Sequence, residues 1–436
     1  MLVFDAEKIE LLIAQCRFSE AAAALTALRV DERDAVRRRL LAGVYALGGN
    51  ERALARIVEP SLLGCRTAAD VVAHHAARGG GDFYDDLVGG IVLTWLGAAD
   101  DAYALLRQAH DVAFSERRFH VAVATRERLA HHALLFGDVE RARNELDEAI
   151  GVASDRALPD LLTRCLIAAA RLALYCGDPT GSARRLERAL SLKRSSAILA
   201  LCAPIGVQLA AESGDDATLR SWISPEIVDT SLHSDDPEPA MAATVALLIA
   251  SAASPDEIAV AMATRRALFS TENPAMSPEL FSMTARYGDL GVGRLAVRTL
   301  AAVVAPRRRY LRAHYLLARA HLAFRTGQAS WIDHASDAAR AFNAIGLRRW
   351  TNEAMLLMVR QKNARRGTQS RPAGATLTER EQQVADLIRR GARNREVALA
   401  LQISEHTVER HVSSILGRLG LRSRWQISDI RKKTEH

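Results

Sequence analysis

The sequence predicts an all-α protein: a superhelix of helical-hairpin repeats followed by a small four-helix domain of helix-turn-helix type. Three observations favour this fold class. Only 5% of the 436 residues are aromatic, and alanine, leucine and arginine dominate, which is typical of helices rather than sheets. Glycine-containing turns recur through the body of the chain at a near-constant spacing. The C-terminal segment carries start and stop signals for four short helices.

The body repeats one local pattern, a small-residue turn between two amphipathic runs. Its turn glycines follow one another at about forty residues, with one gap about twice as long in which residues 253–259 supply the missing turn. A period of this length, with alanine where neighbouring helices touch, predicts stacked helical hairpins. The turn glycines are Gly49, Gly97, Gly137, Gly177, Gly214, Gly288 and Gly327. The alanines are Ala102, Ala142, Ala149, Ala183 and Ala189.

Two stretches of the body depart from the repeat pattern. Residues 60–86 include three consecutive glycines and the pair Phe83-Tyr84. This stretch is either a lid over a ligand or a connection whose aromatic side chains pack locally, and the role of residues 79–86 stays open. Residues 224–238 are acidic and are expected to form a second loop.

Charge divides the chain into parts. Residues 362–436 hold 16 basic and 8 acidic residues, whereas residues 1–361 hold 42 and 43. The basic excess therefore lies in the C-terminal segment, as phosphate binding requires. Residues 362–375 are rich in arginine, glycine and serine, which is typical of a linker. The expected domains are the repeat body at 1–361, the linker at 362–375 and a DNA-binding domain at 376–436.

The C-terminal segment reads as helix, helix, tight turn, helix and a final helix. Thr378 with Glu381 forms a capping box that begins the first helix. Asn394 caps the second, and the turn from Gln402 ends at Ser404, which caps a third helix that runs to Leu419. The fourth helix is expected at Ser423–Lys433. Two short helices joined by such a turn are typical of helix-turn-helix domains.

The third helix, residues 404–419, has two distinct faces. Its apolar positions follow helical periodicity and predict one buried stripe. The opposite face is polar and carries small residues, which suits a helix that enters a major groove, although many terminal helices have a solvated polar face. The apolar stripe is Val408, Val412, Ile415, Leu416 and Leu419, and the polar face is His406, Arg410, Ser413 and Gly417, flanked by Glu409 and Ser414.

This segment resembles the LuxR-type (GerE-like) DNA-binding domain. The resemblance runs from Leu377-Thr378 through Asn394 and Thr407-Val408 to Ser423-Arg424. It implies a four-helix domain that binds duplex DNA as a dimer, with the third helix in the major groove. By the same resemblance Glu409, Arg410 and Ser413 read bases, while Arg395, Thr407 and Arg424 contact phosphates. Many members carry lysine at the position of Glu409, so the sequence preference need not match theirs.

The repeats of the body resemble the tetratricopeptide class. Their longer period is similar to the effector-sensing superhelix of large LuxR-type activators. This resemblance implies a concave groove that binds a small molecule, a peptide or a protein.

Signatures of catalysis and of metal binding are absent from the sequence. It has no G-x-x-x-x-G-K-[ST], H-E-x-x-H or C-x-x-C motif, so no enzyme activity, cofactor or metal is expected. The five cysteines are odd in number and are expected to be reduced thiols in the cytoplasm. No run of eighteen apolar residues occurs, so no membrane partner is expected.

The sequence therefore predicts a cytoplasmic, sequence-specific transcriptional regulator. Its expected partners are double-stranded DNA, a second copy of the chain, RNA polymerase, and a small-molecule or peptide effector in the repeat groove. In the alternative, the chain is a constitutive dimeric scaffold or a protein–protein adaptor, whose repeats contact a protein and no effector exists.

Overall fold

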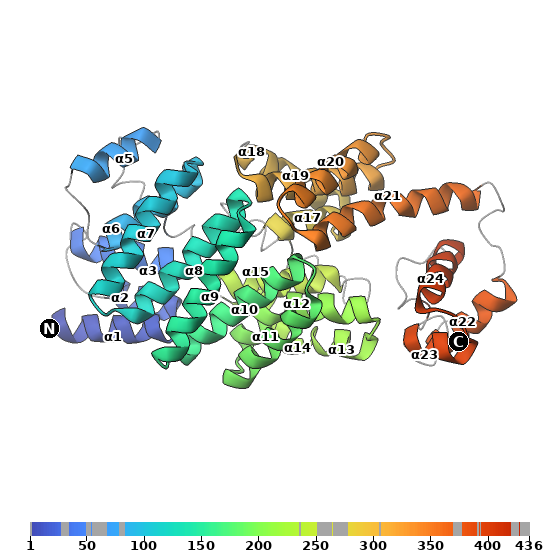
Figure 1. Ribbon diagram of the computed structural model, residues 1–436, viewed down its shortest axis with the longest axis horizontal. Helices are drawn as coiled ribbons and strands as arrows, with labels where there is room; N and C mark the ends of the chain where they lie inside the picture. Colours follow the sequence, from blue (N-terminus) through green and yellow to red (C-terminus); the bar gives the residue numbers. More distant parts are fainter. Residues whose placement is uncertain are drawn as a thin grey trace.

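Helices form all the regular structure of the part of the chain that the computed structural model describes. The described residues are 2–27, 35–48, 54, 68–77, 83–234, 237–250, 264, 278–304, 307–368, 377–389, 392, 394–419 and 427. No strand occurs among them, so the all-α prediction is confirmed. Figure 1 shows the body as layers of antiparallel helices, followed by a smaller group of helices at the C-terminal end.

The N-terminal half of the body forms helical hairpins in sequence order. Within residues 2–48 and within residues 68–192 each helix packs against the next one along the chain, as the repeat pattern predicts, and the helix at 35–48 packs against the helix at 83–96. The helices are α1 (Leu2–Ala14), α2 (Phe18–Ala27), α3 (Ala35–Gly48), α5 (Ala68–Ala77), α6 (Phe83–Leu96), α7 (Ala99–Ser115), α8 (Phe119–Phe136), α9 (Val139–Asp155), α10 (Pro159–Tyr175) and α11 (Pro179–Leu192).

The second half of the body contains helices that are less regular in length. They are α12 (Ser196–Ser213), α13 (Asp216–Ser221), α14 (Pro225–His233), α15 (Pro237–Ile249), α17 (Pro278–Tyr287), α18 (Leu290–Val303), α19 (Arg309–Arg325), α20 (Trp331–Ala344) and α21 (Arg348–Thr368).

Left-handed turn residues follow one another every twenty residues between α6 and α11. Gly97, Gly137 and Gly177 have φ of 82°, 82° and 84°, and between them Arg117 and Ala157 have φ of 61° and 51°. A residue with positive φ ends each helix and reverses the chain. The glycine spacing predicts three of these five turns, since the connections at Arg117 and Ala157 use residues that seldom adopt this conformation.

The remaining predicted turn residues do not all adopt positive φ. Gly214 and Gly327 adopt positive φ as expected, with 66° and 70°. Gly288 lies between α17 and α18 without positive φ. Gly49 and residues 253–259 lie outside the described residues.

Alanine side chains allow neighbouring helices to approach closely. Ala102, Ala142, Ala149 and Ala189 are at most 1% exposed, whereas Ala183 is half-buried. At the centre of the body, α8 contacts α1 and α3 on one side and α19 on the other, besides its neighbours along the chain. A helix surrounded in this way is buried on nearly all faces, and the buried residues of α8 include Arg126, Glu127 and Arg128.

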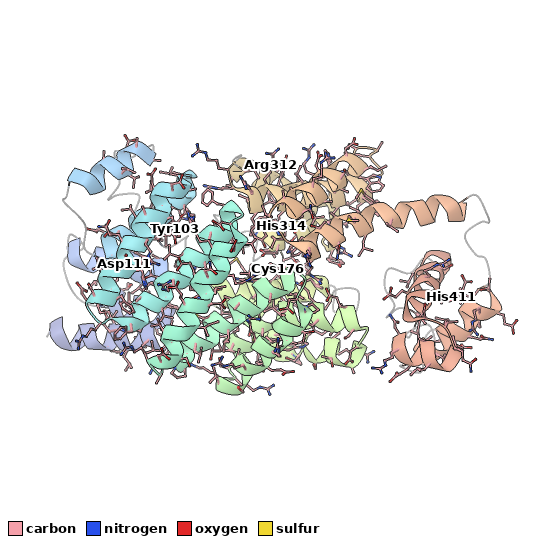
Figure 2. All side chains as sticks on the ribbon, viewed as in Figure 1. Tyr103, Asp111, Cys176, Arg312, His314 and His411 are labelled. Atoms are coloured by element: carbon pink, nitrogen blue, oxygen red, sulfur yellow. The ribbon has the colours of Figure 1, made fainter. Side chains whose placement is uncertain are left out.

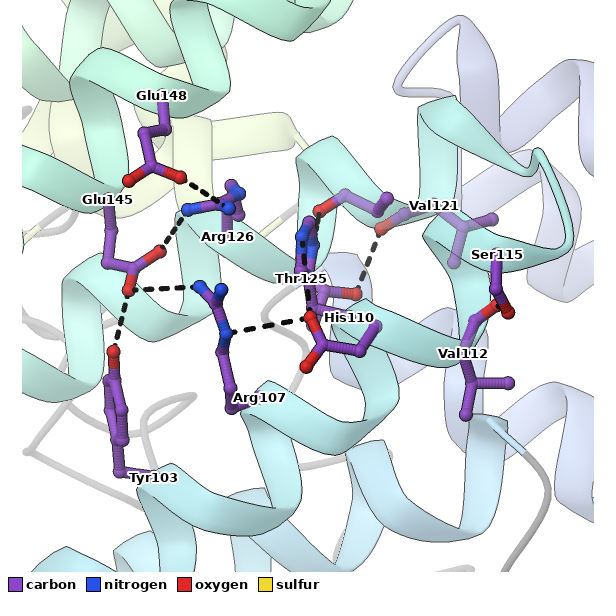
Figure 3. Close-up of polar contacts among 12 residues, drawn as sticks. Tyr103, Arg107, His110, Val112, Ser115, Val121, Thr125, Arg126, Glu145 and Glu148 are labelled. Atoms are coloured by element: carbon purple, nitrogen blue, oxygen red, sulfur yellow. Dashed lines mark hydrogen bonds and ion pairs between the residues drawn. The ribbon is translucent and has the colours of Figure 1, made fainter.

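A polar network ties three successive helices together (Figure 3). The Tyr103 hydroxyl of α7 donates to Glu145 of α9 at 2.7 Å, and the Arg126 guanidinium of α8 donates to the other oxygen of the same carboxylate at 2.7 Å. Arg107 of α7 approaches Glu145 at 3.8 Å. Because Glu145 is only 5% exposed, its charge is balanced by arginine inside the array rather than by solvent.

The C-terminal helices turn back onto the row of glycine turns. A Cβ placed on Gly137 would lie 2.6 Å from Ile345 Cγ2, and one on Gly177 would lie 3.2 Å from Arg348 Cβ. Next to Gly97, the Arg308 guanidinium donates to the carbonyl oxygens of Thr94, at 3.1 Å, and Trp95. The buried Arg308 guanidinium thereby supplies hydrogen bonds to carbonyl oxygens in the last turn of α6, where the helix dipole is negative.

Three segments differ from the sequence-based expectations. Phe83 and Tyr84 begin α6 and are 2% and 5% exposed in the main core, so this pair belongs to a buried helix start rather than to a loop. Residues 225–233 form α14 rather than a loop, because Pro225 suits the first turn of a helix. Helix α21 runs to Thr368, so the helix continues into the expected linker; lysine, alanine and arginine in 362–366 favour helix despite their polarity.

One described helix, α12, is long and apolar enough to cross a membrane by those measures alone. More than half of this helix, 56%, is buried within the protein, and it packs against α13, α14 and α15. These contacts are those of a core helix.

Candidate nucleic-acid interface

The C-terminal group of helices begins with a capping box. In α22 (Glu379–Arg389), the Glu381 carboxylate accepts from the Thr378 backbone N–H at 2.8 Å, and the Glu381 N–H donates to the Thr378 hydroxyl at 3.3 Å. These reciprocal bonds satisfy two donors at the start of the helix. The predicted start at Thr378 is confirmed.

A tight turn joins α23 (Asn394–Leu401) to α24 (Glu405–Leu419). Gln402 takes φ of 51°, and the Ile403 N–H bonds back to the Ala398 carbonyl at 3.0 Å. Ser404 then accepts from the Thr407 N–H at 3.1 Å, which caps α24. The structure therefore contains the predicted helix–turn–helix unit.

A small apolar core fixes the angle between these helices. Val408 and Ile415 of α24 are fully buried against α22 and α23, and Val412 and Leu416 pack at its edge. This set confirms most of the predicted buried stripe; the side chain of Leu419 lies outside the described part. Of the predicted fourth helix, Ile427 is described, and it is buried in the same core. The core residues are Val384, Ala385, Ile388, Val397, Ala398, Val408, Ile415 and Ile427.

The expected base-reading residues lie on the outer face of α24. Glu409 and Arg410 are exposed, and Arg410 makes no hydrogen bond or ion pair with any described residue. Ser413 belongs to α24, but its side chain lies outside the described part of the chain. Because Val408 and Ile415 anchor the opposite face, the guanidinium of Arg410 is held toward solvent.

The expected phosphate-contacting residues lie near the helix starts. Arg395 is exposed in the first turn of α23, and Thr407 is half-buried in the first turn of α24. The Thr407 hydroxyl lies 2.8 Å from the Ser404 hydroxyl, and both lie where the helix dipole is positive and attracts anions. Arg424 lies outside the described residues.

Two contacts that hold α24 in place were not predicted from the sequence. The Ser414 hydroxyl, expected on the flank of the DNA-facing side, donates to Glu381 of α22 at 2.6 Å. The Arg380 guanidinium donates to the Leu401 carbonyl at the end of α23. Both join residues more than twenty positions apart, so no local spacing signals them. Glu381 is only 4% exposed and serves both the capping box and α24.

The one histidine of this domain whose side chain is described lies on α24. His411 is half-buried on α24 (Figure 2). Among the described residues of the whole chain, no group of three or more histidine, cysteine, aspartate or glutamate side chains could hold a metal ion.

Comparison with known proteins identifies the C-terminal segment. Residues 375–430 match the family described as bacterial regulatory proteins, luxR family. No curated protein matches the chain. Among solved structures, the apo form of RapI is 12% identical with a TM-score of 0.36, over 82% of this chain and 98% of that one. The TPR domain of P58(IPK) is 16% identical with a TM-score of 0.20, over 84% and 99%.

Proposed function

Residues 375–430 are a helix-turn-helix domain of the luxR family of bacterial regulatory proteins. We therefore propose that this chain is a non-enzymatic, sequence-specific regulator of transcription that acts in the cytoplasm. The observation that carries the proposal is the outer face of α24, where Arg410 stands exposed and unpaired among the described residues while Val408 and Ile415 fill the core. The basic excess of residues 362–436 supports it.

In this proposal α24 enters the major groove. Arg410 pairs two guanidinium donors with a guanine, and Glu409 accepts from a cytosine amine. Ser413 provides a third base contact. Arg395, Thr407 and Arg424 contact phosphates and set the orientation of the domain without reading sequence.

A homodimer follows from the size of the domain. One helix-turn-helix module buries only about 600–1,000 Å² on DNA, which is too little for tight specific binding by itself. Helix α21 offers a surface for the second copy, because Met355, Leu356 and Val359 are 48%, 53% and 49% exposed on one side of it. Apolar residues gathered in this way mark contact sites, and α21 is the last helix before the DNA-binding domain.

The oligomeric state tests this dimer surface. In sedimentation analysis, Leu356→Glu should turn the dimer into a monomer. Asn343→Glu places the same charge at an exposed position of α20 and should leave the dimer intact. A dimer that survives Leu356→Glu assigns the interface to another surface.

The repeat array is proposed to modulate DNA binding by responding to an effector, and RNA polymerase is proposed as the partner at the promoter. An effector acts by binding one arrangement of the chain more tightly than another.

Genome-wide DNA occupancy tests the regulator directly. The wild type should give discrete peaks that share a two-fold sequence motif, and Arg410→Ala should lose them. Arg188→Ala, an exposed position on α11, should retain them. Peaks that persist in Arg410→Ala would remove Arg410 from base reading. A wild type without peaks, at any effector concentration tried, would favour the adaptor alternative.

A further inference from the structure

A charged cavity lies inside the repeat array. Its volume is about 100 Å³, and its walls come from α8, α9, α10, α12, α15 and α17. Three arginines, three glutamates and one histidine line it among leucine, isoleucine and alanine side chains. The charged and histidine residues are Arg128, Arg164, Arg171, Glu127, Glu238, Glu279 and His131.

The hydrogen-bond acceptors of this cavity are already engaged. Glu127 accepts from Arg164 twice, at 3.2 Å each, and Glu238 accepts from the same guanidinium at 2.9 Å. The third carboxylate, Glu279, accepts from the Tyr310 hydroxyl. Burial favours the protonated form of Glu238, but Arg164, Arg128 and Arg171 together lower its pKa to about 2. Glu238 is therefore an anion committed to the protein's own arginines.

The donors of the cavity, in contrast, are only partly engaged: the Arg128 guanidinium approaches Glu127 at 3.5 Å, and the charge of Arg171 interacts with Glu279 and Glu238. Arg171 is half-buried, and its guanidinium makes no hydrogen bond or ion pair with any described residue. The Arg128 Nε and the His131 Nε2 are both buried and without a hydrogen-bond partner. Burial, with Arg128 and Arg171 nearby, lowers the pKa of His131 to about 3, so its ring is neutral at pH 7 and can donate from one nitrogen.

An excess of buried donors selects a ligand that brings acceptors. Leaving a buried donor unpaired costs about 1–3 kcal/mol, which a ligand oxygen recovers. A guanidinium suits the planar carboxylate and the phosphate group best, because it donates two parallel hydrogen bonds. The volume limits size: at about 30 Å³ per water, 100 Å³ holds about three waters, or an anion of four or five heavy atoms.

We propose that this cavity binds a small oxyanion, a carboxylate or phosphate group, through Arg171 with Arg128 and His131, and that this anion is the effector of the DNA-binding activity proposed above. The ligand is either a free small anion or the anionic end of a longer molecule. Glu127 and Glu238 hold Arg164 in place, and the apolar wall accepts a methyl or methylene group.

The cavity contacts the helix that leads to the DNA-binding domain. Tyr175 lines the cavity, and its ring meets that of Trp350 on α21. A second connection runs from Glu279 to Tyr310, whose ring meets His314 at 4.6 Å between centroids, and from His314 to Trp350 at 4.7 Å. An anion that changes the position of Arg171 or Glu279 therefore acts on side chains that pack directly against α21.

Titration calorimetry on the full chain tests the site with three probes: sodium acetate, inorganic phosphate and the neutral isostere acetamide. We expect one acetate or phosphate per chain and no heat from acetamide. Binding of acetate alone assigns a carboxylate, and binding of phosphate alone assigns a phosphate group. Arg171→Gln should weaken binding at least tenfold, whereas Arg188→Gln on the surface should bind as the wild type does.

A second variant keeps the test valid if Arg171→Gln does not fold. His131→Leu removes an unpaired donor at similar volume, so it should fold, as judged by circular dichroism, and bind the anion more weakly. Failure of both anions to bind, equal binding of acetamide, or full binding in both variants would overturn the proposal. DNA binding is measured separately, with and without the anion. Absence of DNA binding in both conditions contradicts the regulator and not the cavity, whereas equal DNA affinity in both conditions contradicts the effector role.

Discussion

The ring of Tyr175, at the end of α10, meets the ring of Trp350 on α21 edge to face, with 5.3 Å between centroids and an interplanar angle of 64°. The two residues are 175 positions apart in sequence, and both are almost fully buried, at 3% exposed. This contact joins the fifth turn of the regular array to the helix that precedes the DNA-binding domain. Aromatic pairs of this geometry contribute about 0.5–1.5 kcal/mol beyond the area that they bury.

Trp350→Ala should lower the free energy of unfolding of the body by about 3–5 kcal/mol, the range for removing a buried large aromatic side chain. Asn352→Ala on the same helix, at an exposed position, should cost much less. Urea denaturation followed by circular dichroism measures both. Equal losses in the two variants would mean that α21 is held by its exposed side rather than by the Tyr175 contact.

Acidification should destabilise the body through its buried histidines. Burial lowers the pKa of His132 and of His314 to about 4, from an ordinary value of 6.5. Between pH 6.5 and about 4 the unfolded chain binds protons that the folded chain excludes, so stability is full above pH 6.5 and falls as the pH falls. Each ring contributes up to about 1.4 kcal/mol per pH unit.

The matched variants for this pH dependence are His314→Gln and His233→Gln. The first removes a buried titrating ring that lies 2.9 Å from the Ser282 hydroxyl, and the slope of stability against pH should become shallower. The second replaces a histidine with a 70% exposed side chain and serves as the surface control. A slope that is the same in wild type and His314→Gln would show that this ring does not titrate on unfolding.

Glu381→Ala should loosen the DNA-binding domain, because one carboxylate serves both the capping box and Ser414 of α24. Loss of the cap costs about 0.5–2 kcal/mol, and the unpaired Ser414 hydroxyl adds to it. Hydrogen exchange should become faster in α22 and α24. Gln382→Ala, at the exposed neighbouring position, should exchange like the wild type. If protection from hydrogen exchange is unchanged in Glu381→Ala, the position of α24 depends on its apolar core and not on Glu381.

Arg410→Ala and Arg395→Gln should affect DNA binding in different ways. Loss of a bidentate guanine contact costs about 1–3 kcal/mol, or roughly 5- to 150-fold, on the specific site only. Loss of a phosphate contact weakens specific and nonspecific binding alike and makes the slope of log affinity against log salt shallower by about one. Fluorescence anisotropy over a salt series separates them. Two variants with the same pattern would contradict the assigned roles.

Much of the fold could be predicted from local sequence. The glycine turns, the capping box at Thr378 and the stripe of Val408 and Ile415 each depend on residues within one or two helical turns of each other. The turns at Arg117 and Ala157 could not be predicted, since their φ is imposed by the packing of the helices on either side.

The contacts that shape the two candidate sites could not be predicted from the sequence, for a different reason. Ser414 reaches Glu381 across 33 positions, and Arg164 reaches Glu238 across 74. Spacing within one helix gives no information about such pairs. The sequence therefore does not distinguish the three cavity arginines from other arginines on helices. They are Arg128, Arg164 and Arg171, and only the fold places them around one cavity.

The return of the C-terminal helices onto Gly97, Gly137 and Gly177 has a consequence for how this architecture can evolve. An open solenoid gains or loses hairpins with little disturbance, because each repeat contacts only its neighbours. Here Arg308, Ile345 and Arg348 face three particular turns at forty-residue spacing. Duplicating or deleting one hairpin between α7 and α10 would shift every later turn out of register with them. Relatives that keep this closure should therefore conserve the number of hairpins and vary in the length of their connections.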